Sequence, residues 1–260
     1  MTQSQKTNHP DSTRSTIYHD MKTKHLSLTR HLFPVRPMAT LLLMILATLG
    51  TTARADNRTR IVFHTDKGDI RIALYDETPR HRDNIVKLVG EGFYDGLLFH
   101  RVIKSFMIQG GDGGSRDAAP DKMLGDTPES YTLPAEIRYP TLFHKRGVLA
   151  AAREGDDVNP GRASSMSQFY IVCGRKFTDA ELDKIQERID RATQGTVKLT
   201  PGIRKVYREV GGTPHLDGQY TVFGEVIEGM EAVEAIENAP TNDFDRPLED
   251  IRIIKAEVEK

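Results

Sequence analysis

One short segment of the chain carries most of the residue types that could do chemistry. Residues 99–112 read FHRVIKSFMIQGGD, which places a cation, apolar side chains and an amide within a dozen positions before a glycine turn. Arg101 offers rigidly arranged N–H donors that stay charged at every working pH. Phe106 and Met107 follow as apolar groups, and Gln109 adds an amide. A fixed donor beside an apolar surface can hold a neutral ring and stabilise charge that develops next to it.

Simpler structural explanations exist for the same residues. A single arginine between apolar residues is most often a solvated strand arginine, and an isolated aromatic residue or methionine is most often part of the core. We expect His100 to be structural and residues 110–114 to form a turn, because they lack the spacing and the lysine of a phosphate-binding loop. The histidines show no metal-ligand spacing, so we expect no metal and no other cofactor. The expected core residues include Phe99, Ile108, Phe169 and Phe223.

Hydrophobic periodicity predicts a mainly β fold with few helices. Two alternating runs flank Asp66-Lys67-Gly68, which is typical of an opening β-hairpin. Thr78-Pro79 is typical of a helix start. The expected strands include residues 60–65, 69–74, 220–226 and 251–258, and the expected helices are 79–90 and 230–238. This pattern suits either a closed β-barrel capped by helices or a β-sandwich.

A charged stretch from residue 177 to residue 212 interrupts this pattern. Thr178-Asp179-Ala180-Glu181 fits a capping box, and apolar residues recur after it at helical spacing. We therefore expect an inserted amphipathic helix, followed by a second short helix around residues 203–210.

The segment at 99–112 resembles the signature of the cyclophilin family, F-H-R-x-I-x-x-F-M-x-Q-G-G-D. Three later segments resemble family motifs in the same order: 147–152 the G-x-L-x-M-A stretch, 167–171 the S-Q-F-F-I stretch, and 215–224 the segment ending in H-V-V-F-G. The resemblance covers nearly all of residues 60–259 apart from insertions. It implies a closed cyclophilin-like antiparallel β-barrel capped by helices, with the helical segment at 177–212 inserted, and peptidyl-prolyl cis-trans isomerase activity.

Cyclophilins accelerate rotation about X-Pro peptide bonds. The barrier is about 18–20 kcal/mol, while the two isomers differ by about 1 kcal/mol, so the catalyst must favour the twisted amide. By resemblance, Arg101 stabilises that amide, and Gln109 hydrogen-bonds the substrate backbone and steadies the arginine. Ala152 and Arg153 would offer backbone groups to the residue before proline. The substrate-binding residues implied by the resemblance are Phe106, Met107, Ala152, Arg153, Gln168, Tyr170, His215, Leu216 and Tyr220.

Three positions depart from the family pattern. His215 stands where many members have a tryptophan that donates a hydrogen bond to cyclosporin, so we predict weak cyclosporin binding with catalysis retained. Tyr220 replaces a histidine but keeps an aromatic ring. Arg153 replaces an asparagine, which predicts a preference for acidic residues before proline. The segments 154–166 and 177–212 are longer than in the family and fall in loops, where added length is tolerated.

The N-terminal region predicts export. A basic zone, the apolar run ATLLLMILATLG at 39–50 and the small-x-small site Ala53-Arg54-Ala55 together describe a signal peptide over residues 1–55. We expect cleavage near Ala55, an isomerase domain over 56–260, and a periplasmic or secreted location. Translation starting at Met21 in place of Met1 would give a more normal signal. The net charge of -1 gives no basic field that would attract nucleic acid.

Two other classes of protein stay open. A cyclophilin-like scaffold could bind proline-containing segments as a chaperone or assembly factor, although binding alone would not require Arg101. An uncleaved apolar run would instead give a membrane-tethered structural protein, but the run is shorter than the about 20 residues of a comfortable span. We expect a monomer without a stable membrane anchor after cleavage, whose partners are proline-containing polypeptides. Cys173 is the only cysteine, which excludes an internal disulfide.

Overall fold

An eight-stranded antiparallel sheet forms the centre of the structure. The computed structural model describes residues 56–259, so the predicted signal peptide, its cleavage site and both candidate start codons lie outside the described residues. The strands pair in the order β10-β1-β2-β9-β6-β8-β4-β3. Their bounds are β1 (Arg60–Thr65), β2 (Gly68–Leu74), β3 (Phe99–Ile103), β4 (Met107–Gly110), β6 (Val148–Ala151), β8 (Phe169–Val172), β9 (Val222–Glu228) and β10 (Ile253–Glu259). A separate two-stranded sheet joins β5 (Thr132–Leu133) to β7 (Ser164–Ser165).

The first two strands form the predicted hairpin. In β1, Ile61 and Phe63 are fully buried, and in β2 Ile70 and Ile72 are buried opposite them. Because side chains alternate across a strand, this row defines one inward face of the sheet. The hairpin prediction is therefore confirmed, with Gly68 taking the positive φ of 119° that the turn requires.

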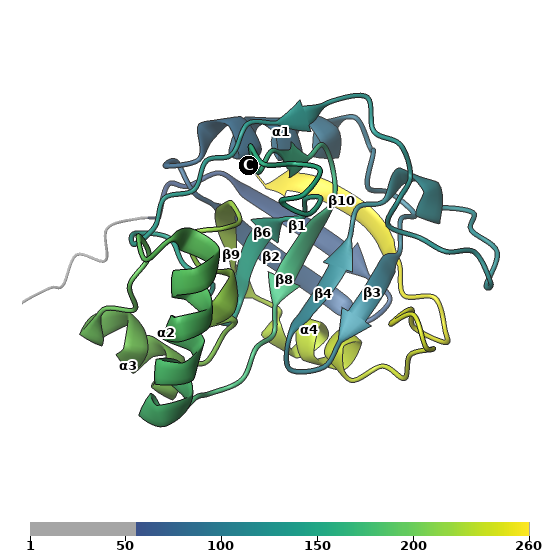
Figure 1. The fold of residues 1–260 in the computed structure, drawn as a ribbon. Helices are drawn as coiled ribbons and strands as arrows, with labels where there is room; N and C mark the ends of the chain where they lie inside the picture. Colours follow the sequence, from purple (N-terminus) through teal and green to yellow (C-terminus); the bar gives the residue numbers. More distant parts are fainter. Residues whose placement is uncertain (1–55, 260) are drawn as a thin grey trace, which may run out of the picture. The chain divides into compact units, whose positions relative to one another are not determined.

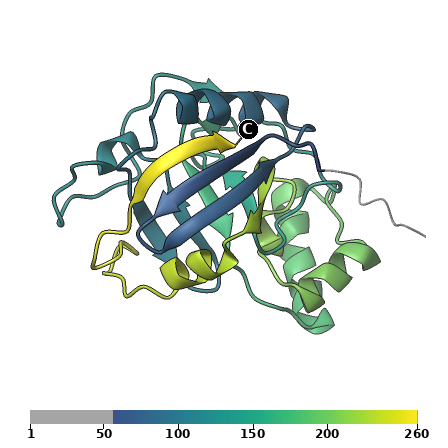
Figure 2. The ribbon, with the colours of Figure 1, turned by 180° about the vertical axis from the view of Figure 1, so that it is seen from behind.

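The sheet curls until its two outer strands approach each other. Next to β3 and β10, an isolated antiparallel bridge joins Leu98 to Arg252, and the N–H of Phe99 donates to Ile251 O at 2.9 Å. Figure 2 shows β10, in yellow, lying beside β1 as the outer strand of the sheet. The fold is mainly β, as expected, in the form of a curled antiparallel half-barrel with four α-helices. Full closure of the barrel stays a prediction.

Within residues 56–259, four α-helices surround this sheet: α1 (Pro79–Gly90), α2 (Asp179–Thr193), α3 (Pro201–Glu209) and α4 (Met230–Glu237). Two 3-10 turns, η1 (Gly113–Ser115) and η2 (Pro214–Leu216), complete the set. Helices α1 and α4 lie at opposite ends of the curled sheet, whereas α2 and α3 lie together beside β9 (Figure 1).

The start of α1 differs from the sequence prediction. Pro79 is the first helical residue, as expected, but Thr78 makes no capping hydrogen bond with its side chain. The carboxylate of Glu136, far along the chain, accepts instead from the backbone N–H groups of Arg80 and His81 at 3.3 and 3.0 Å. A tertiary contact therefore replaces the local cap.

Helix α2 begins as predicted. The Thr178 side chain accepts from the Glu181 N–H, and the Glu181 side chain accepts from the Thr178 N–H, which completes the capping box. Helix α3 begins two residues before the expected range, because Thr200 caps it through the Ile203 N–H. The two helices share a small core of their own, made by Leu182, Ile189, Val197, Leu199, Ile203 and Tyr207.

The main core fills the inside of the curled sheet. Phe99, Ile108, Phe169 and Phe223 are all buried there, which confirms the core prediction. Phe169 stacks on Phe63 at a ring-centroid distance of 5.1 Å. Cys173 belongs to the same core and is a fully buried free thiol.

The last two sheet strands begin two residues later than expected. Strand β9 starts at Val222, so Tyr220 lies in the loop before it, and β10 starts at Ile253. In that loop Thr221 Oγ1 accepts from the Glu136 N–H at 2.9 Å. The Thr221 side chain thus bonds to a distant segment at a position where alternation alone predicts a strand.

Candidate active site

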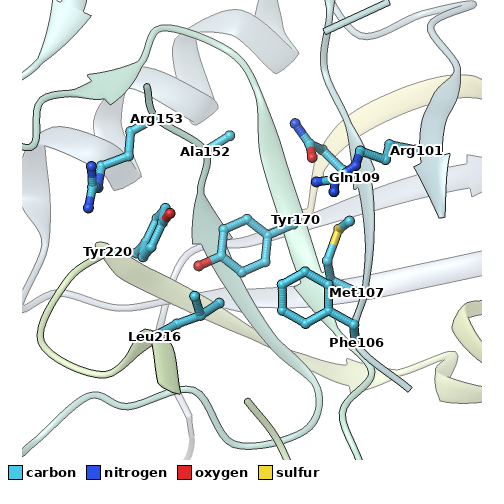
Figure 3. A pocket seen from close by; sticks show the side chains of 9 residues that line it. All are labelled: Arg101, Phe106, Met107, Gln109, Ala152, Arg153, Tyr170, Leu216 and Tyr220. Carbon is cyan, nitrogen blue, oxygen red and sulfur yellow. The ribbon is translucent and has the colours of Figure 1, made fainter. Parts of the chain in front are cut away.

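Side chains from several strands and loops surround one cavity of about 170 Å³. Figure 3 shows Tyr170, Phe106 and Leu216 at its centre, Arg101 and Gln109 on one side, and Arg153 and Tyr220 on the other. The lining residues are Arg101, Phe106, Met107, Gln109, Ala152, Arg153, Tyr170, Leu216 and Tyr220. The structure therefore brings together nine of the eleven site residues predicted from the sequence.

The remaining two residues stand behind this lining. Gln168 accepts a hydrogen bond from Gln109 Nε2 through its Oε1 at 3.2 Å. The His215 ring stacks on Phe106 with the centroids 5.5 Å apart. Burial lowers the pKa of His215 to about 4, so this ring is neutral at working pH.

Strand register explains why Arg101 and Gln109 meet Tyr170. Arg101 in β3 is paired with Gln109 in β4, and Gln109 is paired with Tyr170 in β8. Directly paired residues of an antiparallel sheet point to the same face. Three strands thus present a donor, an amide and an aromatic ring in one row.

The turn between β3 and β4 supplies the apolar part of the cavity. Ser105 takes a left-handed φ of 58°, and its N–H donates to Glu237 Oε1 of α4 at 2.7 Å. Phe106 and Met107 follow at once, and Met107 is almost fully buried. The turn is therefore held from below by a helix while its next residues face the cavity.

Asp245 is the side-chain partner of Arg101, and sequence reasoning missed it. Its Oδ2 lies 3.4 Å from Arg101 Nε, and both side chains are about 40% exposed, at 43% and 41%. The Asp245 carbonyl accepts from the Val102 N–H at 2.8 Å, which ties its loop to β3. Gln109, expected to steady the arginine, bonds to Gln168 instead. No local pattern around Asp245 indicates this contact across more than a hundred residues.

The positive charge of Arg153 is already balanced. Its guanidinium lies 2.6 Å from Asp156, donates to Gln219 O at 2.9 Å, and stacks 4.4 Å from the centroid of the Tyr220 ring. Only 4% of its side chain is exposed. The electrostatic basis for a preference for acidic residues before proline is therefore weak.

Ala152 contributes less backbone than expected. Its N–H donates to Gln168 O at 3.0 Å, and its carbonyl accepts from the Ser165 N–H at 2.8 Å. The Ala152 N–H is therefore already bonded within the protein, whereas its carbonyl keeps a second acceptor position that a substrate could use. The longer segment 154–166 borders a second, adjoining groove of about 670 Å³, which Ala152 and Gln168 also line.

A buried hydrogen-bond chain lies behind Tyr170. The Tyr170 hydroxyl is 3.0 Å from His144 Nε2, His144 Nδ1 is 3.0 Å from Asp217 Oδ1, and the Tyr207 hydroxyl donates to Asp217 Oδ2 at 2.8 Å. Burial raises the pKa of Tyr170 well above its usual value, so its hydroxyl keeps its proton. Sequence reasoning gave none of His144, Asp217 and Tyr207 a role.

The remaining polar groups near the site have structural explanations. His100 is buried, and burial lowers its pKa to about 4, which fits the structural role expected for it. Asp112 accepts from the Gly114 N–H and opens η1, so the glycine run forms a turn as expected. Within residues 56–259, no group of three metal-ligating side chains is present, and no helix is long and apolar enough to cross a membrane.

Comparisons with known proteins identify the family of this chain. The family model for cyclophilin-type peptidyl-prolyl cis-trans isomerases matches residues 60–258. A candidate peptidyl-prolyl cis-trans isomerase of Staphylococcus haemolyticus is 33% identical over 206 residues, covering 78% of this chain and 93% of its own. A second, from Staphylococcus aureus strain COL, is 34% identical over 203 residues, covering 77% and 92%.

The fold has a counterpart among solved structures. A cyclophilin-type isomerase of Cryptosporidium parvum is 24% identical, with a TM-score of 0.54, and the match covers 78% of this chain and 98% of that one. The chain belongs to the cyclophilin-type peptidyl-prolyl cis-trans isomerase family.

Proposed function

We propose that the cavity at Arg101 binds the proline ring of X-Pro segments and that Arg101 stabilises the twisted amide during rotation. The observation that carries this proposal is the placement of a guanidinium at the edge of a cavity lined by Phe106, Met107 and Leu216. Asp245 occupies Nε. Within residues 56–259, Nη1 and Nη2 have no hydrogen-bond partner, so both can donate to a substrate.

The chemistry needs electrostatics and no proton transfer. Twisting the amide breaks its resonance and returns a lone pair to the proline nitrogen. A donor aimed at that nitrogen, or at the rotating carbonyl, stabilises the twisted state more than either planar isomer. Because arginine stays charged and planar, Arg101 fits this role without titrating.

Gln109 and Tyr170 extend the same row beyond the arginine. The Gln109 amide is oriented by Gln168, which leaves its Oε1 to accept from a substrate N–H. The Tyr170 ring and the Phe106 ring offer flat apolar surfaces to the proline. Substrate binding then depends on groups that are fixed before the substrate arrives.

The test is the isomerisation rate of a short Ala-Pro peptide with the purified protein and its Arg101→Ala variant. We expect the variant to lose about 100-fold in kcat/KM, the cost of removing one preorganised donor. Arg204→Ala is the matched control, because Arg204 pairs with Asp183 in the inserted segment and lies outside the cavity. A folded wild type that accelerates nothing would favour the non-catalytic chaperone or assembly factor.

We further propose that the substrates are exported polypeptides and that the protein works in the periplasm or outside the cell as a monomer. The apolar run and the Ala53-Arg54-Ala55 site support export. N-terminal sequencing of the processed protein should give Asp56 as the first residue. A mature chain that retains the apolar run would contradict this and favour the tethered alternative.

A further inference from the structure

The inserted helical segment is connected to the cavity by buried hydrogen bonds. The chain runs from Tyr207 in α3 through Asp217 and His144 to Tyr170 in β8. Tyr207 and Asp217 are fully buried, His144 is 1% exposed and Tyr170 is 5% exposed. Since water is excluded from every link, these bonds are stronger than equivalent bonds at the surface, and each unpaired group would be costly.

The hydrogen-bond partners of His144 connect Asp217 to Tyr170. The backbone N–H of His144 donates to Asp217 Oδ1 at 2.9 Å, and the His144 ring approaches the same oxygen through Nδ1. A carboxylate only accepts, so Nδ1 carries the ring proton. The Tyr170 hydroxyl lies 3.0 Å from Nε2 of the same ring, so the hydroxyl and the ring are hydrogen-bonded to each other. The hydroxyl of Tyr170 is therefore committed to His144 and cannot turn freely toward the cavity.

The inserted segment also holds the loop that carries His215 and Leu216. Helix α2 packs against η2. Gly218 has a φ of 70°, and a Cβ at this position would lie 2.3 Å from Cγ2 of Val197. A side chain here would meet the inserted segment, so the close approach requires glycine.

The hydroxyl of Tyr170 departs from the family motif. Tyr170 stands where the family motif S-Q-F-F-I has its second phenylalanine, so the hydroxyl is an addition to the family pattern. In this chain it meets His144, whose other side is connected to the inserted segment.

We propose that Tyr207 of the inserted segment is a positioning residue for the proline pocket, acting through Asp217 and His144 on the ring of Tyr170. This inference rests on the proposed function of the cavity. The inserted segment then helps to hold one wall of the cavity in position. Removing the Tyr207 hydroxyl frees one oxygen of Asp217, and the change passes along the chain to a wall of the cavity.

The test compares two tyrosines of the same small core. Tyr207→Phe removes only the hydroxyl and keeps the ring against Phe143, whose centroid is 5.6 Å away. Tyr139→Phe is the matched control, because its hydroxyl donates its hydrogen bond to Lys198 O at 2.6 Å and not to Asp217. We expect Tyr207→Phe to raise KM for an Ala-Pro peptide about threefold to tenfold with kcat changed less than about twofold, and Tyr139→Phe to leave both within about twofold.

A double-mutant cycle tests whether the effect passes through Tyr170. Once Tyr170→Phe has removed the last hydroxyl, adding Tyr207→Phe should have no further effect on KM. Equal KM values for wild type and Tyr207→Phe, or an undiminished effect of Tyr207→Phe in the Tyr170→Phe background, would overturn the proposal.

A spectroscopic measurement separates this proposal from the proposed function. In aromatic ¹H–¹³C spectra, the ring signals of Tyr170, assigned with Tyr170→Phe, should shift in Tyr207→Phe and stay in place in Tyr139→Phe. This shift is expected even if the wild type isomerises nothing, in which case only the proposed function fails. Unmoved Tyr170 signals in a folded Tyr207→Phe protein would refute the positioning role.

Discussion

His81 and His144 lie in different regions of the molecule with similar partners. His81 Nδ1 is 2.7 Å from a Glu136 oxygen, and its Nε2 is 2.9 Å from Ser164 Oγ. His144 lies between Asp217 and Tyr170, with both distances at 3.0 Å. Both histidine side chains are 1% exposed. In each region a carboxylate, a histidine ring and a hydroxyl form one buried unit.

The His81 unit and the His144 unit differ in where their hydroxyl groups lie. The His81 unit connects the start of α1 to β7, and its hydroxyl, on Ser164, is buried at 2% exposure. A serine beside a histidine and a carboxylate resembles a nucleophilic triad, but no substrate reaches a serine in this position. The His144 unit ends on the wall of the cavity and continues at its other end into α3. The same set of hydrogen-bonding groups therefore stabilises the fold in the His81 unit and supports the cavity in the His144 unit. The two roles differ only in the segments that each unit connects.

The largest expected effect is on stability, and it follows from removing the carboxylate of the His81 unit. Glu136→Ala removes the cap of α1 and leaves His81 Nδ1 unpaired, so we expect the free energy of unfolding to fall by about 3 kcal/mol in urea denaturation. Because this unit does not reach the cavity, kcat/KM of the folded fraction should stay within about twofold. Asp217→Ala is the counterpart, and it should lower both stability and substrate affinity. A loss of activity as large in Glu136→Ala as in Asp217→Ala would contradict the distinction.

The next expected effect is a dependence of stability on pH, caused by the buried histidines. Burial lowers the pKa of His81, and it lowers those of His100 and His215 to about 4, from the 6.5 of an unfolded histidine. Between pH 6.5 and pH 4 the unfolded chain binds more protons than the folded one, so stability is fully present above pH 6.5 and falls as the pH drops. We expect a loss of about 2 kcal/mol or more between pH 7 and pH 4.5 in thermal or urea unfolding. A flat stability profile over this range would show that the rings are not held neutral.

A smaller effect is expected at Asp245, whose carboxylate is exposed, whereas those of Glu136 and Asp217 are buried. Asp245→Asn keeps the shape of the loop but removes the charge beside Arg101 Nε, and we expect kcat/KM to fall about threefold while stability changes little. Since both groups are exposed to solvent, the difference from wild type should shrink in 1 M salt, where charges are screened beyond about 3 Å. An effect that persists at high salt would assign Asp245 a steric role.

The smallest effect concerns the balanced charge at the groove. Asp156→Asn removes the carboxylate that neutralises Arg153, so peptides with Glu before proline should gain about twofold in kcat/KM over peptides with Lys. The wild type should show an almost flat profile across the same peptides. A strong acidic preference in the wild type would restore the interpretation based on the sequence alone.

Local patterns were sufficient for much of this fold. Alternation around Gly68 predicted the hairpin, and the Thr178–Glu181 box predicted α2, because both depend on residues that are close in the chain. The signature at 99–112 also indicated Arg101 and Gln109 together, and neighbouring strands bring them face to face. Resemblance to known motifs then added Ala152, Tyr170 and Leu216 to the same cavity.

The missed features all depend on contacts between distant segments. Asp245 meets Arg101 across 144 positions, and Asp217 meets His144 across 73. Neither aspartate differs from a surface residue in its local sequence. Glu136 was missed as the cap of α1 for the same reason, because Thr78 satisfied the local rule. Packing decided these pairs, and periodicity carries no information about them.

The buried thiol of Cys173 gives the protein a practical property. Cys173 is the only cysteine of the chain, and its sulfur is sealed in the core, with its pKa raised by burial. A thiol that is neither ionised nor accessible reacts slowly with oxidants and alkylating reagents. A cysteine introduced on the exposed face of α2 would therefore be the single site for a fluorescent or spin label, and motions of the inserted segment could be followed without altering the native thiol.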